Sequence, residues 1–156
     1  MLTDIVVPKE TGIDNTAHMN EGFINIPRNR YEWSVALMLL FYLAAGINHF
    51  RVPDFYLPLI PDYLPNKVLL NTLSGVAEIG LALLLVWPAT RRLAAWGIIA
   101  MLLAFLPAHI WFIQKGGCLD PNGLCVPAWV MWVRLLLIHP LLLWWAYGLT
   151  RPVPAS

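Results

Sequence analysis

GINHFRVPDFYLPLIPDYLP, residues 46–65, decides the fold, because four prolines and four aromatic residues lie here between two strongly apolar runs. Each proline removes a backbone donor and disfavours helix at the preceding residue, so no long helix fits this stretch. It is also too apolar for a solvated loop. We therefore expect an irregular lid, rich in proline and aromatic residues, that caps one end of a helical bundle at a membrane interface.

The composition of the 156-residue chain is that of an integral membrane protein. Hydrophobic residues make up 59% of it and charged residues only 12%, and the apolar residues come in long runs. The length predicts one domain. The net charge of +1 and the lack of a basic block argue against a nucleic-acid partner. The expected surroundings are a lipid bilayer.

Four apolar runs predict four transmembrane helices, near residues 31–49, 67–87, 91–113 and 127–149. Each approaches the ~20 residues that an α-helix needs to cross the hydrocarbon core. Asn66 and Thr90 are candidate N-caps for the second and third helices. The predicted fold is an all-α membrane four-helix bundle of residues 31–150, with a polar tail at 1–30 and a short tail at 151–156.

The distribution of basic residues predicts the orientation. Four crossings put both termini and the turn at 88–90 on one side, which carries six basic residues (Lys9, Arg28, Arg30, Arg91, Arg92 and Arg151). The other side carries three (Arg51, Lys67 and Lys115). The positive-inside rule then predicts that both termini lie in the cytoplasm. The expected location is a bacterial inner membrane.

Two charged residues are predicted within the membrane. Glu78 lies near the middle of the second helix and Arg134 in the fourth. Charges at this depth are costly and normally pair or mark a site. One interpretation is a buried Glu78–Arg134 ion pair that fixes helix order and register. The other is a site for a proton or a polar ligand head.

Histidines near the lid are the remaining candidates. His49 ends the first helix, and His109 lies in the last outward turn of the third, just after Pro107. They could bind a metal, a haem or a quinone carbonyl, or simply satisfy backbone groups. His139 follows Arg134 by five residues, so on an α-helix it points away, and we interpret it as structural. The candidate polar pocket thus contains His49, Glu78, His109 and Arg134.

Cys118 and Cys125 form the second candidate feature, in the glycine-rich segment KGGCLDPNGLCVP. A tight turn here would bring the two thiols together, and on the predicted outer side a disulfide would persist. The spacing differs from the Cys-x-x-Cys of a catalytic pair, and zinc would need two more ligands. The pattern favours a structural disulfide.

An ordered series of short motifs between about residues 42 and 147 resembles the DoxX family, in its branch of small four-helix membrane proteins. The motifs are Gly46-x-Asn48-His49-Phe50-x-x-Pro53-x-Phe55-Tyr56, Ile60-Pro61, Tyr63-Leu64-Pro65, Ser74-Gly75-x-x-Glu78, Thr90-Arg91-Arg92, Pro107-Ala108-His109 and Trp132-x-Arg134-Leu135. The resemblance implies a four-helix membrane fold and an association with membrane redox complexes, one of them linked to quinone-dependent sulfur oxidation.

Three functions remain open at this point. The first is a non-catalytic accessory or assembly subunit of a membrane redox complex, which needs a protein partner. The second is a quinone-binding or electron-transfer subunit with its site beneath the lid. The third is a small transporter formed by a homo-oligomer. Because no complete catalytic or metal-ligand set is recognisable, we expect no catalytic residue and no metal, and a quinone is the candidate cofactor.

Overall fold

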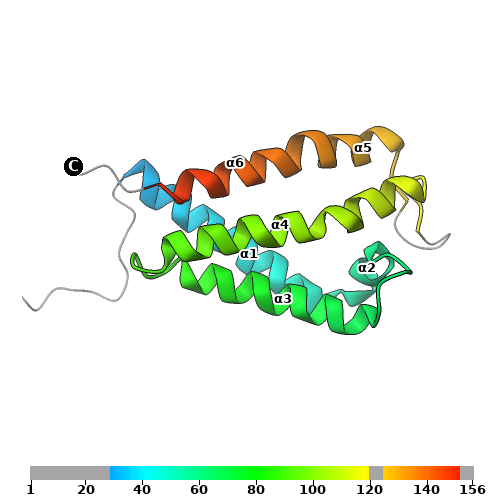
Figure 1. Cartoon of the computed structure of the whole chain (residues 1–156), viewed down its shortest axis with the longest axis horizontal. Helices are drawn as coiled ribbons and strands as arrows, with labels where there is room; N and C mark the ends of the chain where they lie inside the picture. Colours follow the sequence, from blue (N-terminus) through cyan, green and yellow to red (C-terminus); the bar gives the residue numbers. More distant parts are fainter. Residues whose placement is uncertain (1–28, 120–124, 152–156) are drawn as a thin grey trace, which may run out of the picture.

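Four long helical spans, side by side, form the described part of the protein (Figure 1). The computed structural model describes residues 29–119 and 125–151, so almost all of the predicted tails at 1–30 and 151–156 lies outside the described residues. The helices are α1 (Arg30–Arg51), α3 (Lys67–Leu84), α4 (Arg91–Gln114) and a last span made of α5 (Ala128–Val133), the π-helical η3 (Arg134–Ile138) and α6 (His139–Leu149). All four are long and apolar enough to cross a membrane. The predicted all-α bundle is confirmed.

Helix boundaries follow local capping chemistry in part. Asn66 accepts a hydrogen bond from the Leu69 N–H at 3.0 Å and caps α3 as predicted. Thr90 precedes α4, but its hydroxyl donates to the carbonyl oxygens of Leu84 and Trp87 instead of capping. The prediction of a Thr90 side-chain cap is therefore wrong. The hydroxyl instead satisfies the Leu84 carbonyl oxygen at the end of α3, at 2.6 Å.

The stretch between α1 and α3 is more regular than the sequence predicted. Helix α1 continues to Arg51, and residues 53–59 form a short helix α2 (Pro53–Tyr56) followed by the 3₁₀ turn η2 (Leu57–Leu59). Val52 separates the two helices with an extended φ of −134°, because the proline after it disfavours helix there. Pro53 starts α2 at a position where a missing N–H costs nothing. We call residues 52–65 the lid.

The core lies toward the end of the bundle away from the lid. Helix α1 packs on α3, α3 on α4, and α4 on α6. The buried side chains of this core are Val35, Met38, Tyr42, Ala82, Leu85, Ala94, Ala95, Ile98, Met101, Leu102, Ala146 and Leu149. The alanines let the helix backbones approach closely, as small residues do in membrane bundles. Trp145 of α6 closes the ring by donating to the Ser34 hydroxyl of α1 at 2.7 Å.

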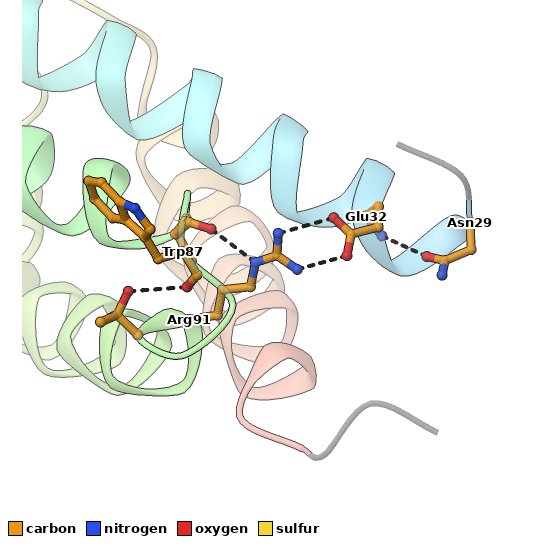
Figure 2. A network of polar contacts seen from close by, with 6 residues as sticks. Asn29, Glu32, Trp87 and Arg91 are labelled. Carbon is orange, nitrogen blue, oxygen red and sulfur yellow. Dashed lines mark hydrogen bonds and ion pairs between the residues drawn. The ribbon is translucent and has the colours of Figure 1, made fainter. Parts of the chain in front are cut away.

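A polar network fixes the same end of the bundle (Figure 2). Arg91, at the start of α4, makes a bidentate ion pair with Glu32 of α1, with N–O distances of 2.8 and 3.1 Å. Its Nε also donates to the Leu85 carbonyl at 3.0 Å. Asn29 caps α1 by accepting from the Glu32 N–H. One guanidinium therefore joins α1, the end of α3 and the start of α4.

Arg91→Gln should lower the free energy of unfolding by about 1–3 kcal/mol, because it removes charge-assisted hydrogen bonds and leaves Glu32 without its partner. Reversible unfolding in detergent micelles would measure this. The neighbouring Arg92 is exposed and is the matched control, so Arg92→Gln should change stability little. Equal effects of the two substitutions would contradict the structural role of Arg91.

Candidate functional site

A cavity of about 270 Å³ lies beneath the lid, between the four spans. Helix α1 contributes His49, α3 contributes Glu78, α4 contributes His109 and the last span contributes Arg134, so the structure gathers all four residues of the predicted polar pocket. The remaining lining residues are Phe41, Tyr42, Ala45, Tyr56, Leu59, Ile60, Asn71, Ser74, Leu102, Phe105, Ala108, Ile138, His139 and Leu142. Tyr56, Leu59 and Ile60 among them belong to the lid.

Close packing of α1 on α3 builds one wall of this cavity. A Cβ atom on Gly75 would lie 2.7 Å from Phe50 Cε2, 2.8 Å from His49 Cβ and 3.0 Å from the Gly46 carbonyl oxygen. A Cβ on Gly46 would lie 2.8 Å from the Gly75 carbonyl oxygen. Only glycine fits at either position without a shift of the helices.

This wall brings His49 and Glu78 together. Helical side chains tilt toward the N-terminus of their own helix, so on antiparallel helices the two side chains lean toward each other. His49 Nε2 and Glu78 Oε2 lie 3.6 Å apart, and both residues are buried. His49 and Glu78 lie on opposite sides of the Gly46–Gly75 contact along the two helices. Their side chains lean toward this contact from either side and approach each other beside it.

Asn71 fixes the His49 ring. Its Nδ2 donates to the His49 carbonyl oxygen at 2.9 Å, and its Oδ1 lies 2.7 Å from His49 Nδ1. Because an amide oxygen can only accept, we assign the proton on this side of the ring to Nδ1. Nε2 is then the atom that faces Glu78. With Nδ1 protonated, the His49–Glu78 pair has no net charge when a second proton lies on Nε2 or on the carboxyl group, and a charge of −1 when neither carries one.

The predicted Glu78–Arg134 ion pair is absent from the described part of the chain. Glu78 approaches His49 instead, and Arg134 forms no ion pair or hydrogen bond with any described residue. The prediction was wrong because depth and helix face alone do not decide which neighbour a side chain meets. The tight α1–α3 contact gives Glu78 a nearer partner, while Arg134 lies on the last span, across the cavity.

His139, interpreted from the sequence as structural, lines the cavity on the same side as Arg134. The reason is the π-helical turn of η3, in which the His139 N–H bonds to the Arg134 carbonyl oxygen, five residues earlier. The wider turn aligns residues i and i+5, which an α-helix would separate. The His139 and His109 rings then meet edge to face, with centroids 4.9 Å apart. Pro140 just beyond, which lacks an N–H, was the only signal of this turn in the sequence.

Three buried side-chain polar atoms have no hydrogen-bond partner among the described residues: Tyr42 Oη, Glu78 Oε2 and His139 Nε2. The three residues are 2%, 5% and 3% exposed, and all three line this one cavity. Buried polar atoms are normally satisfied, and in hydrocarbon an unsatisfied one costs several kcal/mol. Tyr42 Oη and His139 Nε2 are therefore hydrogen-bonding groups that the described protein does not use, whereas Glu78 Oε2 lies 3.6 Å from His49 Nε2, just beyond hydrogen-bond distance.

The lid covers the cavity with the side chain of Tyr56. An ion pair on the outer side of the lid holds it in place. Tyr56 stacks on His49 with ring centroids 3.9 Å apart. Burial, and to a smaller degree Glu78, raises the pKa of Tyr56, so its hydroxyl keeps its proton. On the outer side, Lys67 donates to Asp62 at 2.6 Å and Lys115 lies 4.0 Å from it. The hydrogen bond from Lys67 lowers the pKa of Asp62, which keeps this contact charged.

The cysteines lie apart from the cavity lining. Cys118 and Cys125 form a disulfide in the connection between α4 and α5. Gly117 is buried at the base of this connection with a φ of +79°, where its carbonyl oxygen accepts from the Val126 N–H at 2.9 Å. No group of three His, Cys, Asp or Glu side chains within residues 29–119 and 125–151 is arranged to hold a metal ion.

Gly75→Ala should lower the free energy of unfolding by about 1–3 kcal/mol, since the new methyl group meets side chains of α1 at less than 3.0 Å. Gly80, on the same helix, has open space at its Cβ position. Gly80→Ala should therefore stabilise the helix by up to about 1 kcal/mol. Unfolding in detergent would compare the two, and a neutral Gly75→Ala would refute the close contact.

Comparison with known proteins gives a family but no function. A family model described as a domain of unknown function, DUF8561, matches residues 37–150, a range that includes every residue lining the cavity. No curated protein matches the chain, and no solved structure does. The match covers well over half of the sequence, so the chain belongs to the DUF8561 family.

Proposed function

We propose that this protein is a membrane-embedded binding protein whose cavity receives the polar head of a lipid-soluble molecule. The observation that carries the proposal is the set of three unpartnered buried atoms on Tyr42, Glu78 and His139, all in residues that line one cavity. A ligand oxygen would accept from the Tyr42 hydroxyl, and a ligand hydroxyl would donate to Glu78 Oε2 or to an unprotonated His139 Nε2. A chain that needed only to fold would gain nothing from leaving them unsatisfied.

A quinone is the candidate class that the sequence suggested, and the cavity is compatible with it. Its volume of about 270 Å³ is close to the lower limit of about 300 Å³ for small-molecule pockets, which suits one substituted ring. Apolar side chains such as Leu102, Phe105 and Leu142 alternate with the polar groups around it. The resemblance to the DoxX family supports the same class.

Neighbouring alanines in α1 provide a direct test. Ala45 lines the cavity and Ala44 is outside it. Ala45→Phe should fill part of the cavity and weaken binding of a decyl-chain benzoquinone by at least about tenfold, since the ring and the phenyl group compete for one space. Ala44→Phe should leave the affinity unchanged. Titration of the purified full-length protein in lipid nanodiscs measures both.

Mass spectrometry of molecules extracted from freshly purified protein is the complementary measurement. A stoichiometric hydrophobic molecule, lost in Ala45→Phe and kept in Ala44→Phe, is the expected result. If neither the added quinone nor any co-purified molecule distinguishes the two variants, the cavity is not a binding site and the proposal is wrong.

The second candidate is an accessory or assembly subunit of a bacterial inner-membrane redox complex, with its termini in the cytoplasm. Only 11% of the residues in the most apolar segment of the last span are buried inside the bundle. The corresponding shares are 28% for α1, 22% for α3 and 28% for α4. Leu136, Leu137 and Trp144 are among its most exposed side chains. A partner helix would cover this face as well as lipid does.

Extraction of the native membrane in mild detergent separates the two candidates. Stoichiometric co-purification with a larger oxidoreductase, through contacts that Leu137→Trp disrupts, would support the accessory role. The matched change Leu40→Trp, on the exposed face of α1, should not affect such a complex. Recovery of the protein alone, with a bound lipid-soluble molecule, would leave binding as its function.

A further inference from the structure

Arg134 brings an uncompensated positive charge into the cavity. Its side chain lines the cavity, yet no described carboxylate pairs with it. A charged group inside a membrane bundle normally faces a partner of opposite charge. Within residues 29–119 and 125–151, the Arg134 guanidinium has no such partner and donates no hydrogen bond. The charge is therefore unmatched in the described part of the protein.

No other titratable group of the described cavity lining forms an ion pair with Arg134. Glu78, on α3, is the only acidic residue among the described lining residues, and it approaches His49 and not Arg134. His109 on α4 and His139 on the last span are either neutral or positive. Tyr56 on the lid keeps its proton. The positive charge of Arg134 therefore has no partner of opposite charge in contact with it among the described lining residues.

Arg134 and the two histidines His109 and His139 lie at one wall of the cavity. The π-helical turn of η3 puts His139 on the same side as Arg134, and the His109 ring lies against His139. The Nε2 of His139 has no described partner there, and it donates to an anion in the states in which it carries a proton. A planar guanidinium beside an imidazole suits the two oxygen atoms of a carboxylate or the oxygens of a phosphate.

Apolar side chains mark a route from this wall to the lipid. Phe41 of α1 and Ile138 of η3 line the cavity and are also 46% and 47% exposed, so they lie where the cavity meets the outside of the bundle. Close packing of α1 is with α3 and not with η3. A chain that leaves the cavity between Phe41 and Ile138 would enter the hydrocarbon directly.

We propose that the cavity takes an amphipathic anion, whose carboxylate or phosphate head pairs with Arg134 and bonds to His139 while its apolar chain passes between Phe41 and Ile138. This inference rests on the proposed binding function and narrows the class of ligand. The negative charge of the head offsets the positive charge of the guanidinium. A carboxylate and a phosphate ester share the chemistry that Arg134 recognises.

The test uses the purified full-length protein in nanodiscs of phosphatidylcholine, which has no net charge. Oleate and oleyl alcohol have the same chain and differ only in the head, oleyl phosphate provides the second anion, and a decyl-chain benzoquinone is the neutral ring. We expect oleate or oleyl phosphate to bind about 10- to 100-fold more tightly than oleyl alcohol. The stronger of the two identifies the head.

Arg134→Gln should remove this preference, while Arg134→Lys should keep part of it because the charge remains without the planar fork. Arg92→Gln, at an exposed arginine outside the cavity, should bind like the unchanged protein. If Arg134→Gln does not fold, the comparison of oleate with oleyl alcohol on the unchanged chain still decides the question.

Two results would contradict the inference in different ways. If the alcohol or the quinone binds as tightly as the anions, and Ala45→Phe weakens that binding, the cavity binds a neutral head, so the anion proposal falls while the binding function stands. If none of the four probes binds in a saturable manner, both proposals fall.

Discussion

The backbone contact between Gly46 and Gly75 is the constraint on which the candidate site depends. It removes the side chains that would otherwise keep α1 and α3 apart, and the tilt of helical side chains then brings His49 and Glu78 within 3.6 Å. Asn71, one turn from Gly75, holds the histidine ring in a single orientation. The two glycines therefore make the contact between His49 and Glu78 inside the bundle possible.

The two ends of the bundle serve different purposes. At one end, the Arg91–Glu32 ion pair, the Trp145–Ser34 hydrogen bond and an alanine-rich core hold all four spans together. At the other end the lid covers the cavity, and the disulfide and a small cluster of Leu59, Phe112 and Met131 lie nearby. The last span is the least buried of the four. The cavity exists because the spans are fixed at one end and separate toward the other (Figure 1).

Sequence patterns predicted the number and approximate limits of the helices, because run length and proline position are local properties. They also selected residues that the fold gathers around one cavity, since polar residues in apolar helices are few. Sequence patterns failed where the position or partner of a side chain depended on contacts between helices or on irregular helix geometry. The partner of Glu78 depends on how closely two helices approach, and the position of His139 depends on a π-turn that an α-helical wheel does not contain. The short helix α2 arose because Pro53 begins a helix as readily as it ends one.

Stability alone does not account for this cavity. Buried polar groups in a bundle are often replaced by apolar residues of similar volume without loss, and sometimes with a gain, of stability. Here the open space, the unpaired Arg134 and the unsatisfied atoms of Tyr42, Glu78 and His139 occur together, whereas the rest of the described interior has its buried polar side-chain atoms bonded. Each of these features costs free energy in the protein alone, and a single ligand with an oxygen-bearing head would offset several of them at once. The concentration of unpaired groups in one place therefore favours a binding role over a purely structural one.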